Sequence, residues 1–354
     1  MTTPPLLEVE NLTKHFPVGG GLFRGPSGAV QAVTDVSFSL KPGETLAIVG
    51  ESGCGKSTTG RALLRLLEPT SGRVVLNGEE ITGLAPSQLR AARRHMQMIF
   101  QDPFGSLNPR MTVRETLLEP VLLHGVASGD RAAKWVETLL STVGLSAHHA
   151  DRYPHEFSGG QRQRICIARA LSTRPKLIVC DEAVSALDVS VQAQIVNLLQ
   201  DLQREFGMAY VFISHDLSVV RHISDRVAVM YLGRIVEEAP VDEIFARPRH
   251  PYTRMLLEAA PKPEPGLARR EGAAQGDTPS ALKPPSGCAF HPRCPLATEV
   301  CKTTRPEDTV IGAARVACHH IGAATERVSA ERPWPPALAA RLKVLAEART
   351  KTVA

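Results

Sequence analysis

The chain has 354 residues, 43% of them hydrophobic, which is enough for one large domain and a smaller one. Its 41 Lys and Arg against 36 Asp and Glu give a formal net charge of +5, a mild excess that fits an anionic ligand or a membrane surface nearby and is too weak to indicate DNA binding. We expect no nucleic acid partner. The N-terminal residues MTTPPLLEVE lack the pattern of a signal peptide, and no stretch reaches the roughly 18–20 apolar residues of a membrane span. We therefore expect a cytosolic protein that meets a membrane only through a partner.

Apolar runs and periodic patterns predict an alternation of strands and helices along the chain. The expected strands are residues 6–16, 36–40, 45–49, 73–77, 177–180 and 210–213. Amphipathic periodicity predicts helices at 130–143 and 189–206, each followed by a glycine. This alternation predicts an α/β fold with a mostly parallel sheet. Residues 261–286 have the composition of a linker, and 335–349 are expected to form a small amphipathic helix.

A glycine-rich stretch follows the apolar strand at 45–49. Residues 50–57, GESGCGKS, match G-x-x-x-x-G-K-[ST], whose glycines let backbone N–H groups point at phosphate oxygens. Lys56 can reach the β- and γ-phosphates, the hydroxyl of Ser57 can ligate Mg²⁺, and the helix that starts here adds its positive end. We predict a nucleotide site made of Gly50, Glu51, Ser52, Gly53, Cys54, Gly55, Lys56, Ser57 and Thr58.

A second apolar strand ends in two carboxylates. The run KLIVCDE, 176–182, brings Asp181 to the end of a buried strand, where it can hold Mg²⁺ directly or through water. Glu182 follows it and could orient and deprotonate an attacking water. An isolated Asp-Glu pair is more often a solvated strand end, but the phosphate loop favours the functional interpretation.

The stretch FSGGQ, residues 157–161, places two glycines before another helix and offers a second set of amides and a second positive helix end. One nucleotide does not need two such cradles from one chain, so a second nucleotide held by a second chain would explain it. Together with the phosphate loop, this stretch resembles the ABC-type ATPases, whose signature is LSGGQ; Phe157 replaces the usual leucine. The resemblance implies head-to-tail pairing, in which the signature of one chain closes on the γ-phosphate of the other through Ser158, Gly159, Gly160 and Gln161.

Other motifs match the same family in order. Gln101 in IFQDP resembles the glutamine that contacts Mg²⁺ and the water, and 185–188, SALD, resembles the D-loop. His215 in FISHD resembles the switch histidine, and Phe16 falls where an aromatic ring stacks on adenine. The resemblance thus implies a P-loop NTPase fold with a RecA-like core sheet, an antiparallel β subdomain and a helical subdomain at about 102–165. It also implies catalysis by Gln101, Glu182 and His215, and Mg²⁺ ligation by Ser57, Gln101 and Asp181.

The C-terminal third narrows the family. Residues 247–261, RPRHPYTRMLLEAAP, are similar to the extension of ATP-binding subunits of oligopeptide/dipeptide ABC importers. This resemblance divides the chain into an ATPase domain at 1–255, an extension at 256–330 and a tail at 331–354. It implies ATP hydrolysis that energises solute uptake, as a peripheral subunit on the cytoplasmic face of the plasma membrane.

The implied partners are a second ATPase subunit, another copy or a paralogue, two permease subunits and, indirectly, an external solute-binding protein. Di- or oligopeptides are the expected solute, and nickel, glutathione or another small solute is the alternative. Non-transport ABC ATPases of DNA repair or translation fit less well, because this chain has one cassette with only a modest helical insertion.

The same extension gathers four of the seven cysteines, Cys288, Cys294, Cys301 and Cys318. Disulfides are disfavoured in the cytosol, so clustered thiols indicate a metal. The absence of a tight C-x₂₋₄-C pair weakens zinc, although His319 and His320 lie nearby. Spread thiolates suit an iron–sulfur centre, and the importer resemblance implies a [4Fe–4S] cluster. We expect a structural role for it, with redox sensing as the alternative.

Overall fold

The structure is a computed structural model of the whole chain. The residues that it describes are 4–19, 28–259 and 279–321. The predicted tail at 331–354, with its helix at 335–349, lies outside them, and so does most of the predicted linker at 261–286. Among the described helices, none combines the length and the apolar character that crossing a bilayer requires.

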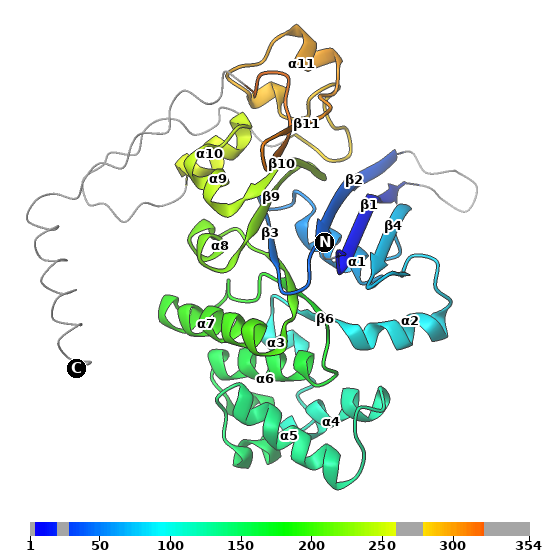
Figure 1. Cartoon of the computed structure of the whole chain (residues 1–354), viewed down its shortest axis with the longest axis vertical. Helices are drawn as coiled ribbons and strands as arrows, with labels where there is room; N and C mark the ends of the chain where they lie inside the picture. Colours follow the sequence, from blue (N-terminus) through cyan, green and yellow to red (C-terminus); the bar gives the residue numbers. More distant parts are fainter. Residues whose placement is uncertain (1–3, 20–27, 260–278, 322–354) are drawn as a thin grey trace, which may run out of the picture.

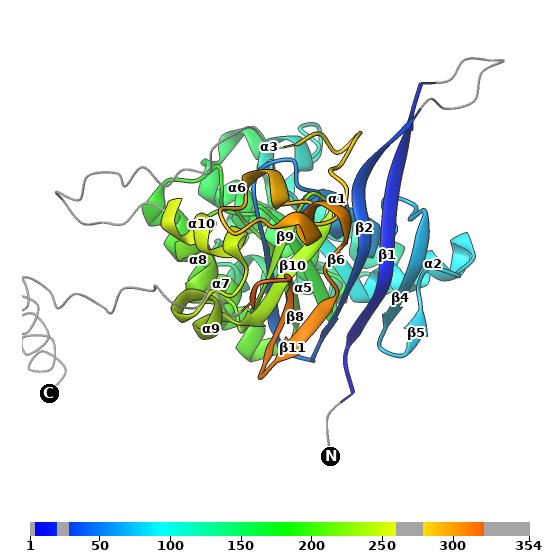
Figure 2. The same ribbon diagram turned by 90° about the horizontal axis from the view of Figure 1, so that it is seen from above.

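A four-stranded antiparallel sheet is formed by the first part of the chain, in the order β2-β1-β4-β5. Its strands are β1 (Leu7–Val18), β2 (Gly28–Leu40), β4 (Ser71–Leu76) and β5 (Glu79–Glu80). β2 starts well before the expected residue 36, because its first half pairs along the outer part of β1, with Phe16 opposite Val30. Figure 2 shows this sheet along one side of the molecule.

An eight-stranded sheet forms the centre, in the order β11-β12-β10-β9-β3-β8-β7-β6. Its strands are β3 (Thr45–Val49), β6 (Met96–Ile99), β7 (Leu177–Asp181), β8 (Ala209–Ile213), β9 (Arg226–Tyr231), β10 (Arg234–Pro240), β11 (Asp308–Ile311) and β12 (Ala314–Ala317). The strands from β6 to β9 pair in parallel, as predicted, whereas β9, β10, β12 and β11 pair antiparallel. The sheet is therefore mixed, because the turn at Leu232 and Gly233 folds β10 back beside β9.

Helices cover both faces of the central sheet. They include α1 (Lys56–Leu63), α7 (Val189–Phe206), α8 (Leu217–Ile223), α9 (Val241–Ala246) and α10 (Pro251–Ala259). α1 contacts β1 and β2 on one side and β7 and β8 on the other, so it lies between the two sheets. α1 begins at Lys56, within the phosphate loop at residues 50–57, and this loop follows the carboxyl end of β3, the usual place for a ligand in such sheets.

A helical subdomain projects from the sheet at one end of the molecule (Figure 1). Its elements are α3 (Pro103–Ser106), α4 (Val113–Leu123), α5 (Asp130–Thr142) and α6 (Gly159–Leu171), with short 3₁₀ turns at Ala147–Asp151 and Pro154–Glu156. The predicted face of α5 is buried, through Ala132, Val136, Leu139 and Val143. A further helix and 3₁₀ turn, α2 (Pro86–Ala92) and Arg93–His95, connect the antiparallel sheet to β6. The fold is that of an ABC-type ATPase, as predicted.

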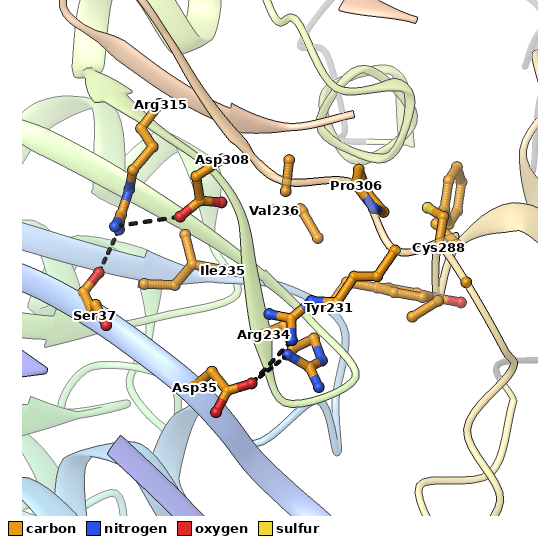
Figure 3. A pocket seen from close by; sticks show the side chains of 15 residues that line it. Asp35, Ser37, Tyr231, Arg234, Ile235, Val236, Cys288, Pro306, Asp308 and Arg315 are labelled. Carbon is orange, nitrogen blue, oxygen red and sulfur yellow. Dashed lines mark hydrogen bonds and ion pairs between the residues drawn. The ribbon is translucent and has the colours of Figure 1, made fainter. Parts of the chain in front are cut away.

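The cysteine segment, defined here as residues 279–321, lies at the opposite end (Figure 1). It contains a 3₁₀ turn at His291–Arg293, the helix α11 (Glu299–Thr303) and the hairpin of β11 and β12. β12 joins the central sheet by pairing with β10. A pocket lies where the cysteine segment meets β2, β9 and β10, and residues of both parts line it (Figure 3). Arg234 and Arg305 both pair there with Asp35 of β2.

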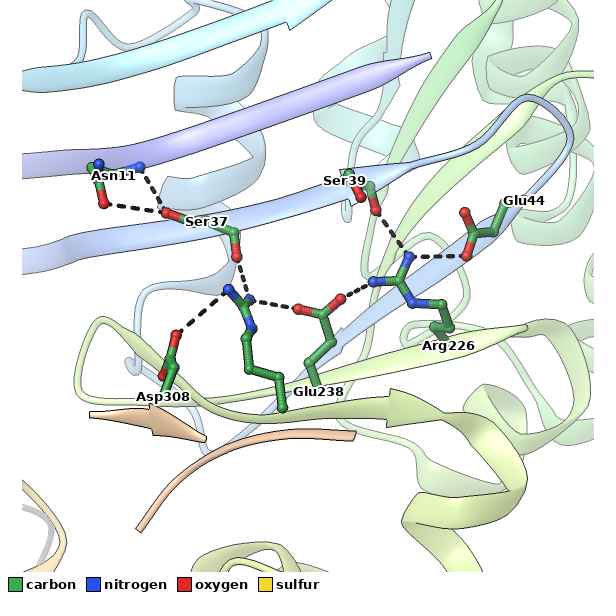
Figure 4. Close-up of polar contacts among 8 residues, drawn as sticks. Asn11, Ser37, Ser39, Glu44, Arg226, Glu238 and Asp308 are labelled. Carbon is green, nitrogen blue, oxygen red and sulfur yellow. Dashed lines mark hydrogen bonds and ion pairs between the residues drawn. The ribbon is translucent and has the colours of Figure 1, made fainter. Parts of the chain in front are cut away.

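Charged side chains connect β2, β9, β10 and β12 (Figure 4). Glu238 of β10 is buried and accepts hydrogen bonds from Arg226 and from Arg315, the latter at 2.6 Å. Arg226 reaches Glu44 at 3.0 Å, and Arg315 reaches the backbone oxygen of Ser37. Burial of a carboxylate on a strand is tolerated here because two guanidinium groups offset its charge.

The stretch HPYT, residues 250–253 and here called the HPYT motif, contains a buried histidine that predicts a pH dependence of stability. His250 is 1% exposed, its Nδ1 accepts the N–H of Tyr252 at 3.1 Å, and burial lowers its pKa to about 3. Below pH 6.5 the imidazole of His250 binds a proton in the unfolded chain but stays neutral in the folded chain. The free energy of unfolding therefore falls as the pH falls. The expected loss is about 2 kcal/mol between pH 7 and pH 5.

Denaturant unfolding of wild type and His250→Asn at both pH values measures this contribution. Glu237, whose pKa is raised by burial, acts with the opposite sign in both proteins, so it cancels in the comparison. We expect the stability difference between the two proteins to shrink or change sign at pH 5. A difference that is constant with pH would mean that His250 is not held neutral.

Candidate functional site

The phosphate loop, residues 50–57, has the shape of an anion cradle. Gly50 and Gly55 have φ angles of 154° and 105°, and a Cβ on either would overlap a backbone oxygen, of Met230 and Ala32 respectively. The Nζ of Lys56 donates to the backbone oxygens of Gly50 and Glu51, both at 2.9 Å. Only glycine fits at these two positions, and the resulting loop leads into the N-terminus of α1, as phosphate binding requires.

A hydroxyl and a carboxylate meet beside the loop. The hydroxyl of Ser57 donates to Oδ1 of Asp181 at 2.6 Å, and Arg61 on α1 lies 3.9 Å from the other oxygen. Burial raises the pKa of Asp181, opposed by the hydrogen bond from Ser57 and by the charge of Arg61. Two hard oxygens that converge at the carboxyl end of β7 form the ligand type that Mg²⁺ prefers.

Two of the three predicted catalytic side chains, Gln101 and His215, converge on the carboxylate of the third, Glu182. Oε2 of Glu182 accepts a hydrogen bond from Nε2 of Gln101 at 3.0 Å and lies 3.4 Å from Nδ1 of His215. Glu182 has a φ of 49°, in the left-handed region, while its N–H donates to the oxygen of Ile213 at 3.0 Å. The backbone therefore leaves the extended conformation directly after β7, and such strain is common at functional sites.

The signature residues cap a helix. Ser158 accepts the N–H of Gln161 at 3.4 Å, and Gln161 accepts the N–H of Ser158 at 3.1 Å, a reciprocal box at the start of α6. A Cβ on Gly160 would lie 2.5 Å from Val191, and one on Gly159 would meet Leu187. The signature therefore packs beside the SALD segment and the first turn of α7.

The remaining predicted contact, Phe16, is 36% exposed on β1, with Nζ of Lys14 5.0 Å from its ring centre. The stacking of this ring on adenine stays a prediction. Cys54 is buried inside the loop, and burial raises its pKa, which makes it a poor nucleophile.

Sequence reasoning missed three side chains near this site: Arg61, Tyr252 and Arg293. The hydroxyl of Tyr252 accepts the N–H of Glu51 at 2.9 Å, and Arg293 pairs with the Glu51 carboxylate. The HPYT motif was a visible signal for Tyr252. Nothing in the local sequence pattern placed Arg293 beside the phosphate loop.

The iron–sulfur prediction is wrong. All four cysteines lie in the described part of the chain, yet no group of three or more His, Cys, Asp or Glu side chains in that part could hold a metal ion. Cys288, Cys294 and Cys318 pack against the apolar cluster that contains Tyr231, Tyr252 and Phe290. Burial raises the pKa of Cys318 to about 11 and also raises that of Cys288 and Cys294, which favours neutral thiols.

The zinc alternative has no support in the described residues either. Nε2 of His319 contacts the backbone oxygen of Thr304 at 2.9 Å, and that of His320 contacts Oγ1 of Thr298 at 2.8 Å. The cysteines behave as small apolar side chains, and their closeness in sequence reflects a shared packing surface.

The residues present fit ATP and Mg²⁺. The glycine cradle and Lys56 suit a triphosphate, and the oxygens of Ser57 and Asp181 suit the metal. A hydrogen bond from Gln101 holds the carboxylate of Glu182. Bound Mg²⁺ neutralises charge that develops on the phosphate oxygens during in-line hydrolysis. Fold and site together define an ATP-binding cassette ATPase.

Comparisons with known proteins agree with this class. The model of the family described as ABC transporter matches residues 33–185, and that described as oligopeptide/dipeptide transporter, C-terminal region, matches residues 236–301. A solved structure of the cassette MJ0796, described as a dimeric post-hydrolysis state bound to ADP and Pi, is 30% identical with a TM-score of 0.59, covering 66% of this chain and 98% of that one.

Two curated relatives extend the similarity through the C-terminal region. The "Probable peptide ABC transporter ATP-binding protein y4tS" of Sinorhizobium fredii is 58% identical over 315 residues, 89% of each chain. The "Oligopeptide transport ATP-binding protein AppF" of Bacillus subtilis is 52% identical over 318 residues, 89% of this chain and 97% of that one. The chain therefore belongs to the ATP-binding subunits of the oligopeptide/dipeptide ABC transporter family, and it is an ATPase coupled to transport.

Proposed function

We propose that this chain hydrolyses ATP to drive the import of di- or oligopeptides. The observation that carries the proposal is the C-terminal match at residues 236–301, continuous with an ATPase site whose groups already converge. Relatives named for peptide transport match across 89% of the chain, which supports the substrate class. The chain itself meets ATP and not the solute.

The proposed assembly pairs this chain with a second ATPase subunit on the cytoplasmic face of the membrane. Each chain would supply the phosphate loop of one site, with Glu182, and the signature at Ser158 and Gly160 of the other. The amides at the start of α6 would then stabilise the γ-phosphate charge. Two permease subunits in the membrane would carry the solute, which an external binding protein would deliver to them.

Within one site the chemistry follows from the contacts. Lys56 leaves the oxygens of Gly50 and Glu51 to meet phosphate oxygens, a change between two sets of acceptors for the same ammonium group. Glu182 accepts a proton from water while Gln101 and His215 hold its carboxylate in place. His215 lies 3.4 Å from the Glu182 carboxylate, and from there it would donate a hydrogen bond to the negative charge that develops on the γ-phosphate.

Reconstitution tests the proposal. The chain is purified with the proposed permeases and second ATPase subunit and placed in vesicles with the binding protein. The vesicles are then supplied with labelled dipeptide, tripeptide or pentapeptide. We expect peptide uptake that requires ATP and is absent when the chain carries Glu182→Gln. Uptake of labelled glutathione or nickel with none of peptide would overturn the substrate class while leaving the ATPase assignment intact.

A further inference from the structure

The cysteine segment contacts the phosphate loop directly. Arg293, at the end of the 3₁₀ turn His291–Arg293, donates to both carboxylate oxygens of Glu51, at 2.8 and 2.9 Å. The two side chains are 7% and 25% exposed. A two-pronged guanidinium–carboxylate pair of this kind fixes direction as well as distance. A residue late in the chain is thereby joined to the second residue of the nucleotide loop.

The surroundings of Arg293 hold its side chain in one place. Its guanidinium lies 5.9 Å from the ring centre of Tyr231 and 6.0 Å from that of Phe290. Tyr231, Tyr252 and Phe290 contact one another with ring centres between 4.6 and 5.4 Å apart, and all three are buried. The pair with Glu51 raises the pKa of Arg293, so it stays charged. Removing either partner would leave the other partly buried and unmatched.

Glu51 is held at three points. Its carboxylate accepts hydrogen bonds from Arg293, and its backbone N–H donates to the hydroxyl of Tyr252 at 2.9 Å. Its backbone oxygen accepts from Nζ of Lys56 at 2.9 Å. Two of these three contacts come from Tyr252 and Arg293, which follow β10 in the sequence. The orientation of the first turn of the loop, and the resting position of Lys56, therefore depend on the C-terminal part of the chain.

We propose that Arg293 is a positioning residue of the nucleotide site, which acts through Glu51 to keep the phosphate loop in its receptive shape. Because Arg293 contacts the loop and not the cluster at Glu182, its influence falls on ATP affinity and not on the hydrolytic step. The cysteine segment is then a brace for ATP binding. This goes beyond the proposed function, because it depends on ATP binding alone and not on the solute carried.

The test measures Mg·ATP affinity of the full-length chain by calorimetry, and ATPase kinetics in the assembled transporter. Arg293→Ala should raise Kd and KM for ATP about five- to tenfold, with kcat within about twofold of wild type. The matched control is Arg305→Ala, which removes an ion pair between the same segment and Asp35 at 2.9 Å that does not involve the phosphate loop. Its Kd, KM and kcat should equal those of wild type.

A double-mutant cycle with Glu51→Gln separates positioning from a general loss of structure. If Arg293 acts through Glu51, adding Arg293→Ala to Glu51→Gln should change Kd little further. Arg293→Lys keeps the charge without the two-pronged geometry, should give an intermediate Kd, and replaces the alanine variant if that one fails to fold. Wild-type Kd in Arg293→Ala, equal losses in Arg305→Ala, or full additivity with Glu51→Gln would each overturn the proposal.

Discussion

Replacing Glu182 with glutamine should lower the rate of ATP hydrolysis at least about 100-fold while ATP still binds. The variant keeps the size of the side chain and its contact with Gln101, which lies at 3.0 Å in the wild type. It loses the negative charge that accepts a proton from water. The phosphate loop and the Ser57–Asp181 pair are untouched, so nucleotide affinity should stay within about threefold of wild type.

Two measurements check this result, phosphate release in the assembled transporter and ATP-dependent dimer formation by light scattering. The hydrolysis-deficient variant should accumulate a closed, ATP-bound pair. Glu79→Gln, an exposed carboxylate on β5, is the matched control and should behave as wild type. Turnover near the wild-type rate in Glu182→Gln would remove Glu182 from the role of base and leave His215 as the group to test next.

Gly55→Ala should weaken nucleotide binding more than about tenfold and lower the free energy of unfolding by an amount on the order of 2–4 kcal/mol. Gly55 precedes α1 with a φ of 105°, and an added Cβ would overlap the backbone oxygen of Ala32 on β2. A backbone oxygen in a paired strand cannot rotate away. The loop must shift instead, and the N–H groups that should face phosphate shift with it.

Gly43→Ala separates the overlap from simple backbone strain. Gly43 has a φ of 72° with no atom within 4 Å of the added Cβ, and it lies outside the loop. We expect a stability loss of about 1 kcal/mol and unchanged ATP affinity. Calorimetric titration with Mg·ATP, on protein first shown to be folded by its thermal transition, distinguishes the two variants. Wild-type affinity in Gly55→Ala would contradict the shape assigned to the loop.

The fold was predictable where sequence pattern and burial coincide. The run TLAIV is β3, the run at 177–180 lies in β7, and α5 and α7 occupy the expected spans. The strand β10 was not predicted, since Glu237 and Glu238 interrupt its apolar pattern and are nevertheless buried. Their charges are matched by backbone N–H groups and by arginines distant in sequence, which no local window contains.

For β10 the prediction missed an element, whereas for the cysteines it proposed a metal site that the structure does not support. Spacing along the chain suggested ligands, but a metal site needs side chains aimed at one point, and spacing does not specify aim. In the folded chain the thiols of Cys288, Cys294 and Cys318 serve as apolar packing against aromatic rings. Four similar residues in a short segment therefore indicated a shared environment and not a shared ion.

The sequence by itself determined the ATPase family and predicted a phosphate loop, because loop chemistry of this kind is local: glycines, a lysine and a serine within eight positions. Only the tertiary structure decided that Gln101, Glu182 and His215 share one point and that Arg293 reaches Glu51. Such contacts join segments far apart in the chain, and the packing of the sheets sets their distances.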